Sequence, residues 1–426
     1  MRVLWVSYAP IGLISRVLFN NPSQSGGWID AMYEPFISQP GVVLGIACIG
    51  PTGKRQEYSD RVILYSIGTV RKISGSLPPK KEVCEWGKII DDFCPDIIMV
   101  WGTEYANGYS VQMAAKQIPV MYFIQGVVGK NNRYSIGKLG LDHWIRPVDL
   151  VSRMQCMVQR RNEKTAYKQI EIERMMVDQS AGIIIDNEWA KSYYQAVSGK
   201  VRTMFLPLPI KKVFLEDHHR IHNCIPHSIF TAAGRYPGKG LFQLIKAIRL
   251  VADKYPDVKL FIPGDMDNRK PDLIFQSPYM KYLNRLIRSL NLSDAVVFCG
   301  PLTSEQMKEH ILSCNVYVMP SLFENHSSSL REAMYLGAPC VTTLVGSVDE
   351  FTQYGVDALT YRTGEIDSLA QCIIRLFENP EYAEQIGENA YRTIRKNFPQ
   401  AALGEALKDI YTTVIGDQDE CTEYDS

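Results

Sequence analysis

The sequence predicts an α/β fold of two doubly wound, Rossmann-like domains that face each other across a cleft. Short apolar runs alternate with longer amphipathic stretches along the 426 residues, as strands and helices do in a parallel sheet. The prolines of Leu206-Pro207-Leu208-Pro209 interrupt this alternation, which then restarts. A chain of this length is expected to form two domains or three. We therefore place a domain boundary near residue 207.

In the first half, apolar runs at five places are expected to form buried strands. They are residues 3–7, 42–48, 97–101, 120–125 and 182–185. The stretches between them are helix-like, for example 28–38 and 105–116. Residues 1–206 are thus predicted to form the N-terminal domain.

The second half repeats the pattern. Its expected strands are residues 229–232, 259–262, 295–298, 316–319 and 340–343. Residues 207–395 form the predicted C-terminal domain, and 387–413 is expected to be helical. We expect a C-terminal helix over 396–416 to pack back on the N-terminal domain. Residues 417–426 form an acidic tail that is expected to fray.

The composition excludes several classes of protein. Lys plus Arg and Asp plus Glu both total 46, so the net charge is zero and a nucleic-acid partner is not expected. The ten cysteines form no CxxC pair and no zinc spacing, which favours reduced thiols. No apolar run reaches the ~18 residues of a spanning helix. These features predict a cytoplasmic protein.

Doubly wound sheets bind their ligands in the turns that follow the carboxyl ends of the strands. Four such turns of this sequence carry residues that suggest a ligand. The first follows the strand at 316–319, where small polar residues lead into a helix. The helix N-terminus offers backbone amides that suit a diphosphate. Glu324 precedes this helix and Glu332 lies one turn inside it, so both carboxylates flank the phosphate site. The alternative is structural, because Ser329 and Glu332 have the spacing of a capping box.

The second turn, residues 233–240, combines glycines with two cations. Gly234 permits close backbone approach, and Arg235 and Lys239 can bind phosphate oxygens. The spacing does not match a P-loop. A solvated basic turn before a helix remains the alternative.

The third turn carries Gly26 and Gly27, which let a phosphate or sugar lie against backbone amides. The alternative is that the two glycines only form a tight turn.

The fourth site is a pair of turns in the first domain. Trp101 and Glu104 follow one predicted strand, and Gln125 with Gly126 closes the next. Their side chains are expected to point at the same cleft. Gln125 can donate and accept hydrogen bonds but cannot titrate, and a buried structural amide is the alternative for it.

Together these motifs resemble the family 4 retaining glycosyltransferases of the GT-B fold. The matching residues, in family order and spacing over 229–362, are Gly234-Arg235 with Lys239-Gly240, Phe298-Cys299-Gly300-Pro301-Leu302, Val318-Met319-Pro320-Ser321, Glu324 with Glu332, Gly337-Ala338-Pro339, and Gly346 with Glu350. The first half matches more loosely, through Gly26-Gly27, Pro95-Asp96-Ile97-Ile98 and Gln125-Gly126.

The resemblance implies transfer of a sugar from a nucleotide-diphosphate sugar to an acceptor hydroxyl, with retention of configuration. By the resemblance, Arg235 and Lys239 neutralise the donor diphosphate, Glu324 contacts the donor sugar and Glu332 binds the ribose. The implied donor-binding set is Gly26, Gly27, Gly234, Asn325, His326, Ser327, Ser328, Ser329, Leu330 and Glu332. No metal and no further cofactor is expected, because cations of the chain already face the diphosphate. Asp265-Met266-Asp267 has the D-x-D form of a metal site but follows a strand where the family has a glycine-rich turn.

One position departs from the family pattern. Many members carry a His where this chain has Gln125. The family His is assigned to the donor sugar or the transition state, and a Gln keeps the hydrogen bond without the charge. We group Gln125 with Arg235, Lys239 and Glu324 as catalytic candidates. Glu104 and Trp101 are expected on the acceptor side, which the N-terminal domain supplies.

The acceptor is predicted from a basic stretch. Residues 130–174 mix Lys and Arg with apolar side chains, which suits peripheral contact with an anionic membrane surface, although a solvated helix face has the same composition. This favours a glycan or lipid-linked acceptor in surface polysaccharide or glycolipid synthesis at the inner face of the membrane. Two other functions stay open: a nucleotide-sugar epimerase of the same fold, and a catalytically silent GT-B binding protein.

Overall fold

The computed structural model describes residues 1–20, 27–69, 77–130, 168–234, 236–265 and 278–424. The chain forms two compact units, which are treated separately below. Unit 1 comprises Met1–Gly129, Lys164–Lys211 and Pro399–Ser426, and unit 2 comprises Lys130–Glu163 and Lys212–Phe398. Beyond residue 163, the chain passes between units after Lys211 and after Phe398, a few residues beyond the predicted boundaries at 206 and 395.

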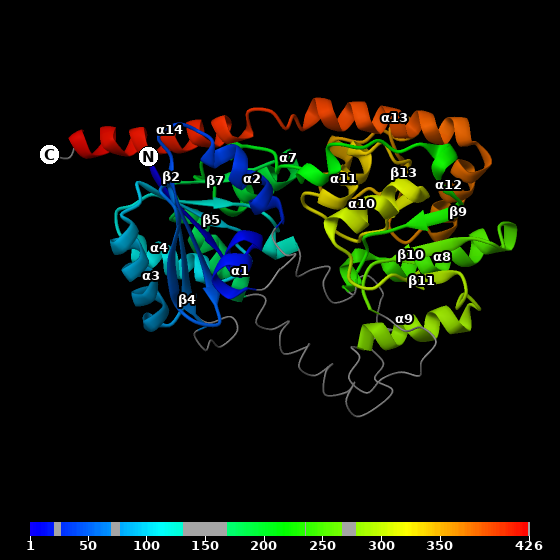
Figure 1. Cartoon of the computed structure of the whole chain (residues 1–426), viewed down its shortest axis with the longest axis horizontal. Coiled ribbons are helices and arrows are strands. Elements are labelled where there is room, and N and C mark those ends of the chain that lie inside the picture. The colour runs from blue at the N-terminus through cyan, green and yellow to red at the C-terminus, as the bar shows by residue number, and fades with distance from the viewer. Residues whose placement is uncertain (21–26, 70–76, 131–167, 235, 266–277, 425–426) are drawn as a thin grey trace. The chain divides into compact units, whose positions relative to one another are not determined.

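Unit 1 is built on an eight-stranded sheet of order β3-β4-β2-β1-β5-β6-β7-β8 (Figure 1). Its strands are β1 Arg2–Ser7, β2 Val43–Gly50, β3 Lys54–Ser59, β4 Val62–Gly68, β5 Ile97–Trp101, β6 Val120–Phe123, β7 Gly182–Ile185 and β8 Thr203–Phe205. The central strands are buried on both faces, as apolar parallel strands require. Only β3 pairs antiparallel. Sequence reasoning missed the β3–β4 hairpin, β8 and, in unit 2, the strand over 359–361. The polar β3 (KRQEYS) is exposed throughout and has no apolar run, whereas β4 (VILYSIG) has such a run and was overlooked.

The helices of unit 1 include one that comes from the far end of the chain. They are α1 Gly12–Phe19, α2 Gly27–Ile37, α3 Lys80–Phe93, α4 Asn107–Ala115, α7 Glu188–Val197 and α14 Leu403–Tyr424. The α14 helix packs on α2, and buried Trp5 donates a hydrogen bond to Tyr411 of α14 (3.1 Å). Two expectations need correction: 387–413 is not one helix, because Ala402 has a left-handed backbone (φ 63°), and the expected frayed tail is helical to Tyr424.

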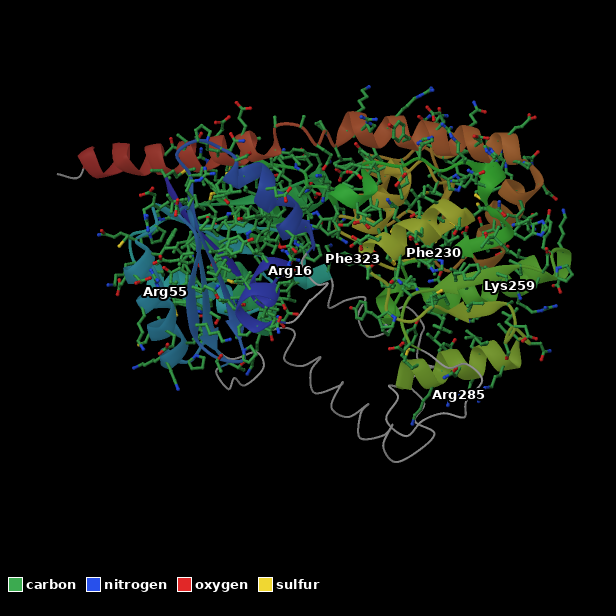
Figure 2. All side chains as sticks on the ribbon, in the orientation of Figure 1. Arg16, Arg55, Phe230, Lys259, Arg285 and Phe323 are labelled. Atoms are coloured by element: carbon green, nitrogen blue, oxygen red, sulfur yellow. The ribbon has the colours of Figure 1, made fainter. Side chains whose placement is uncertain are left out.

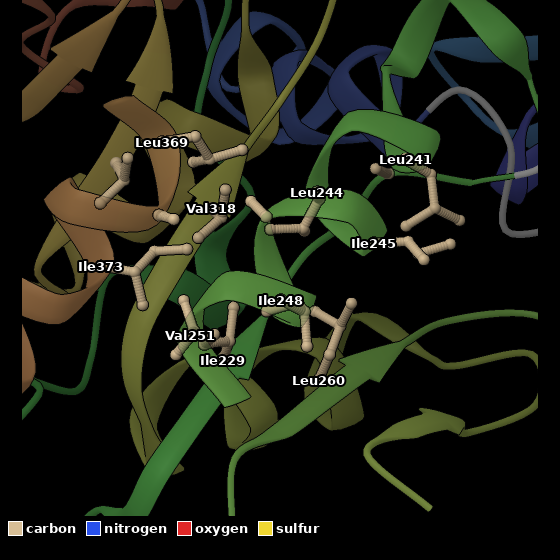
Figure 3. Close-up of a cluster of buried hydrophobic side chains, with 14 of the residues drawn as sticks. Ile229, Leu241, Leu244, Ile245, Ile248, Val251, Leu260, Val318, Leu369 and Ile373 are labelled. Atoms are coloured by element: carbon tan, nitrogen blue, oxygen red, sulfur yellow. The ribbon is translucent and has the colours of Figure 1, made fainter. Parts of the chain in front are cut away.

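Unit 2 is a six-stranded, all-parallel sheet of order β11-β10-β9-β12-β13-β14. Its strands are β9 Ile225–Phe230, β10 Lys259–Ile262, β11 Val296–Phe298, β12 Cys314–Met319, β13 Cys340–Thr343 and β14 Leu359–Tyr361. Its helices are α8 Leu241–Lys254, α9 Pro278–Ser289, α10 Ser304–Ser313, α11 Ser328–Tyr335, α12 Ile366–Glu378 and α13 Pro380–Asn397. Figure 3 shows how α8 and α12 side chains such as Ile248 and Ile373 meet strand residues such as Val318 in one core.

The strand order places one ligand-binding edge in each unit. In unit 2 it reverses between β9 and β12, and in unit 1 between β1 and β5. Open α/β sheets bind ligands at such switch points, beyond the carboxyl ends of the strands. The two doubly wound sheets confirm the predicted fold class.

Figure 2 shows charged side chains such as Arg55 and Arg285 extending from the surface. Among the described helices, none is both long and apolar enough to cross a membrane.

Candidate functional site

The loop after β12, residues 320–327, holds the predicted carboxylate Glu324 in a fixed position. Glu324 Oε1 accepts hydrogen bonds from Lys239 Nζ (2.7 Å) and Ser321 Oγ (2.6 Å). The Glu324 side chain is 11% exposed, whereas Lys239 is 41% exposed. The loop therefore buries the acid and leaves its cationic partner accessible. The fold thus brings together two candidate residues that the sequence separates by 85 positions.

The loop after β9 packs directly against the loop after β12. Leu322 N donates to Gly238 O (2.7 Å). Gly240 has φ 69°, and a Cβ at this position would collide with Pro320 O. Only glycine fits such a left-handed residue under a neighbouring carbonyl. The two loops of the unit 2 switch point are thus locked together. Arg235, the other predicted cation of this turn, lies outside the described residues.

A third turn, after β13, supports the loop that carries Glu324. Ser347 Oγ donates to Asn325 O, and Thr343 Oγ1 donates to Ser321 O (2.6 Å). Gly346 has φ 59°, and a Cβ there would collide with Glu324 O. Sequence reasoning noted Gly346 only through the family resemblance, and it missed Thr343 and Ser347. Their only sequence signal is that polar side chains end a buried strand.

The helix α11 begins directly after this loop. Its first residue is Ser328, so Ser329 lies in the first turn and the capping box that could explain Glu332 is not formed. Glu332 is 8% exposed. The N-cap residue Ser327 is left-handed (φ 49°), and its buried Oγ has no hydrogen-bond partner among the described residues. An N-terminus without a side-chain cap can bind an anion through its amides.

The predicted amide donors need one correction. Leu330 N is already bonded to Ser327 O (2.9 Å), so it does not serve a ligand. Ser328 and Ser329 remain the candidate backbone donors. Asn325 and His326 are buried and bonded to each other through Asn325 Nδ2 and His326 Nε2 (3.1 Å). They therefore hold the loop rather than present side chains to solvent.

A small hollow lies beside the loop after β9. It is a shallow surface depression lined by Gly234, Leu241, Ile262, Pro263, Gly264, Asp265, Met280 and Phe298. Gly234 has open space where a Cβ would stand, as close approach of a ligand requires. Asp265 lies here, but Met266 and Asp267 are outside the described residues. Within the described part of the chain, no three His, Cys, Asp or Glu side chains are grouped as a metal site.

In unit 1, Glu104 and Gln125 converge at the ends of β5 and β6. Gly102 has φ 96°, and a Cβ there would meet Glu104 Oε2 and would stand 3.5 Å from Gln125 Oε1. Trp101, in contrast, is 4% exposed and stacks on Phe123, with ring centroids 4.9 Å apart. The predicted acceptor-side role of Trp101 is therefore corrected to a role in the core. Gln125 is half-buried, which leaves part of its surface accessible.

A second buried acid, Glu173, lies near Glu104 and was missed by sequence reasoning. It is 1% exposed and accepts hydrogen bonds from Tyr194 Oη (2.7 Å) and Thr103 Oγ1 (2.8 Å). Burial raises the pKa of Glu173 to about 6. Burial raises the pKa of Glu104 to about 7, and the neighbouring Glu173 charge adds to this rise. The contact joins positions far apart in sequence, so no local pattern could reveal it.

The raised pKa of Glu104 predicts a pH-dependent stability. The folded chain binds a proton more tightly than the unfolded chain, so the free energy of unfolding should fall as pH rises from about 4.5 to about 7. Glu104→Gln should remove most of this slope and gain about 2 to 3 kcal/mol above neutral pH. Urea unfolding at about pH 5 and about pH 8.5 measures it. Glu405→Gln, on the exposed face of α14, is the control. Equal slopes in all three proteins would contradict the assignment.

The start of α2 places a further cation near a predicted donor residue. A Cβ on Gly27 would collide with Cε of Lys211, so this lysine passes directly over the helix N-terminus. Lys211 also lowers the pKa of nearby Asp30, although burial of Asp30 outweighs that effect and raises its pKa. Gly26 lies outside the described residues. Lys211 was missed because its sequence neighbourhood, after two prolines, carries no motif.

Comparison with known proteins finds a family match over part of the chain. Residues 226–393 match the family described as Glycosyl transferases group 1. N-acetyl-alpha-D-glucosaminyl L-malate synthase of Bacillus anthracis is 26% identical over 182 residues, 41% of this chain and 44% of that protein. MMP alpha-(1->4)-mannosyltransferase of Mycolicibacterium hassiacum is 26% identical over 206 residues, 48% of this chain and 46% of that protein. The chain thus spans less than half the length of these relatives.

Solved structures share the fold over nearly the whole chain. Sucrose-phosphate synthase of Thermosynechococcus elongatus superposes with a TM-score of 0.75 at 14% identity, covering 98% of this chain and all of that one. HepE of Anabaena, in complex with UDP-glucose, has a TM-score of 0.67 at 14% identity, covering 97% of this chain and 100% of that one. The predicted fold of two doubly wound domains is therefore shared with these solved structures.

Proposed function

We propose that this chain is a retaining, hexosyltransferase-like glycosyltransferase that moves a sugar from a nucleotide-diphosphate sugar to an acceptor hydroxyl. The observation that carries the proposal is the bonded pair Lys239–Glu324 at the entry to α11, on the switch point of unit 2. This pair lies inside the region that matches the glycosyltransferase family. A fixed acid, an accessible ammonium and a helix N-terminus are what a sugar diphosphate requires.

The proposed chemistry is a same-face displacement. The acceptor oxygen bonds to the anomeric carbon as the bond from that carbon to the diphosphate oxygen breaks, and the acceptor proton passes to a donor phosphate oxygen. Lys239 and the Ser328 and Ser329 amides stabilise the charge that grows on the departing diphosphate. Glu324 positions the donor sugar, and Glu332 holds the ribose. No side chain of the protein serves as a covalent nucleophile, and no metal is required.

The proposed setting is synthesis of a surface polysaccharide or glycolipid in the cytoplasm. One relative, from Staphylococcus aureus, is named a capsular polysaccharide biosynthesis glycosyltransferase. The Lys and Arg of residues 130–174 are proposed to contact the inner membrane face. Residues 131–167 of this stretch lie outside the described residues. Gln125 is proposed to bond the donor sugar where relatives use a His.

Donor binding and stereochemistry test the proposal. We expect calorimetry to detect UDP or GDP binding and a screen of nucleotide sugars to yield transfer to sugar acceptors. NMR of the first product formed should show the anomeric configuration of the donor. Turnover of donor without an acceptor requirement would instead identify an epimerase, and absence of nucleotide binding would identify a silent protein. A glycosyl group trapped on Glu324, or inversion, would refute the mechanism.

A further inference from the structure

Two exposed tyrosines form a stacked pair at the ligand-binding edge of unit 1. Tyr8 follows β1 and Tyr105 follows β5. Their ring centroids lie 3.6 Å apart and their planes differ by 7°. The residues are 43% and 46% exposed. A soluble protein normally buries large aromatic side chains or uses them to bind a ligand, so a preassembled exposed pair calls for an explanation.

The place of this pair in the fold points to a ligand. β1 and β5 are neighbours, with Ser7 paired to Trp101, and the strand order reverses between them. The rings therefore stand over the switch point of the unit 1 sheet, where open α/β sheets bind ligands. The two loops that carry them come from sequence positions 97 residues apart, so the sheet topology alone assembles the platform.

Polar groups lie beside the rings. Glu104 precedes Tyr105, and its charge contributes to the raised pKa of Tyr105, although burial contributes more. Glu104 shares the space over Gly102 with Gln125. An aromatic surface bordered by a few hydrogen-bonding groups is the usual composition of a small-molecule site.

We propose that Tyr8 and Tyr105 form the binding platform for a hexopyranose ring of the acceptor, with Glu104 as the hydrogen-bonding partner for its hydroxyls. This inference rests on the proposed function and names the acceptor class of that site. The two stacked rings cover each other's inner faces, so a ligand can contact only the outer faces of the pair. Aromatic faces are electronegative, so an outer face attracts the C–H groups of a pyranose. A carboxyl group with a raised pKa can donate as well as accept hydrogen bonds, as sugar hydroxyls require.

The charges at the edge distinguish a sugar from other flat or apolar ligands. Glu104 stands beside the platform and Glu173 beside Glu104, and the ionised form of either acid repels the phosphates of a nucleotide. An acyl chain would cover Glu104 and deprive it of hydrogen-bonding partners, which is costly. A neutral polyhydroxylated ring satisfies both the aromatic faces and the acids.

Fluorine NMR on fluorotyrosine-labelled full-length protein tests the platform directly. The probes are the methyl glycosides of glucose, galactose and mannose. We expect at least one of them to shift the Tyr8 and Tyr105 signals in a saturable way. Tyr58 on β3 of the same unit is the control, since it is 47% exposed but distant from the switch point in strand order. If all three sugars leave Tyr8 and Tyr105 unmoved, or if UDP alone shifts them, the inference is overturned.

Variants extend the test to turnover. Tyr105→Ala should raise KM for the best methyl glycoside acceptor about tenfold or more and leave the donor Kd within about twofold. Tyr105→Phe keeps the ring and should stay within about twofold of the wild type in KM. Tyr58→Ala should behave as the wild type. An unchanged KM in a folded Tyr105→Ala protein overturns the platform. If the wild-type protein does not bind a nucleotide-sugar donor, the proposed function is refuted instead. The NMR titration would still show whether Tyr8 and Tyr105 bind a sugar.

Discussion

Replacing Lys239 by alanine is expected to lower kcat for sugar transfer by about 10² to 10³-fold. The departing diphosphate gains negative charge in the transition state, and Lys239 is the accessible cation bonded to Glu324 at the entry to α11. The substitution removes that charge and also releases Glu324, which keeps only its bond to Ser321. Because the charge matters most as the bond breaks, kcat should fall more than donor affinity. Steady-state kinetics with the identified donor measures both.

A second lysine on the same unit provides the control. Lys246 lies on the exposed face of α8, a helix that begins just after Lys239. Lys246→Ala should leave kcat within about twofold of the wild type. Lys239→Arg keeps the charge but not the compact ammonium geometry, and should retain part of the rate. If kcat of Lys239→Ala stays close to that of the control, Lys239 does not stabilise the leaving group.

Sequence reasoning identified those parts of the site in which chemistry and spacing coincide. Lys239 and Glu324 stand in turns after strands, and Glu332 lies in the helix that follows the second of these turns. Such turns gather at one edge of a parallel sheet. Most strands with continuous apolar runs were equally predictable, since burial on both faces leaves a clear pattern, although β4 (VILYSIG) was overlooked. The strongly polar β3 lacks this pattern, because an edge strand can remain exposed.

What the sequence could not reveal depends on contacts between distant positions. Glu173 becomes a buried neighbour of Glu104 only when β5 and the helix over 168–178 pack together. The stacking of Tyr8 on Tyr105 depends on β1 and β5 being adjacent. The α14 helix packs on α2, although the two helices lie near opposite ends of the sequence. Local propensity carries no information on these contacts, so they follow only from the assembled sheet.

Gly346→Ala is expected to reduce both stability and catalysis, because Gly346 lies under Glu324, the residue proposed to position the donor sugar. Its backbone is left-handed (φ 59°), which costs a non-glycine residue about 1 to 2 kcal/mol. The new Cβ would also collide with Glu324 O, a backbone atom that cannot rotate away. The combined cost should be about 3 to 5 kcal/mol in the free energy of unfolding.

Alanine substitutions at two other glycines distinguish the cost of the left-handed backbone from the cost of the Cβ collision. Gly364 is also left-handed (φ 96°), but no atom lies within 4 Å of a Cβ built there, so Gly364→Ala should show the strain alone. Gly199 has open space and no left-handed backbone, so Gly199→Ala should be nearly neutral. Displacement of Glu324 by about 1 Å should lower kcat of Gly346→Ala about 10²-fold, and neither control should share this loss. Equal unfolding midpoints and equal kcat for Gly346→Ala and Gly364→Ala would show that the turn after β13 does not hold Glu324 in place. Positioning of the acid would then depend on Ser321 and Lys239 alone.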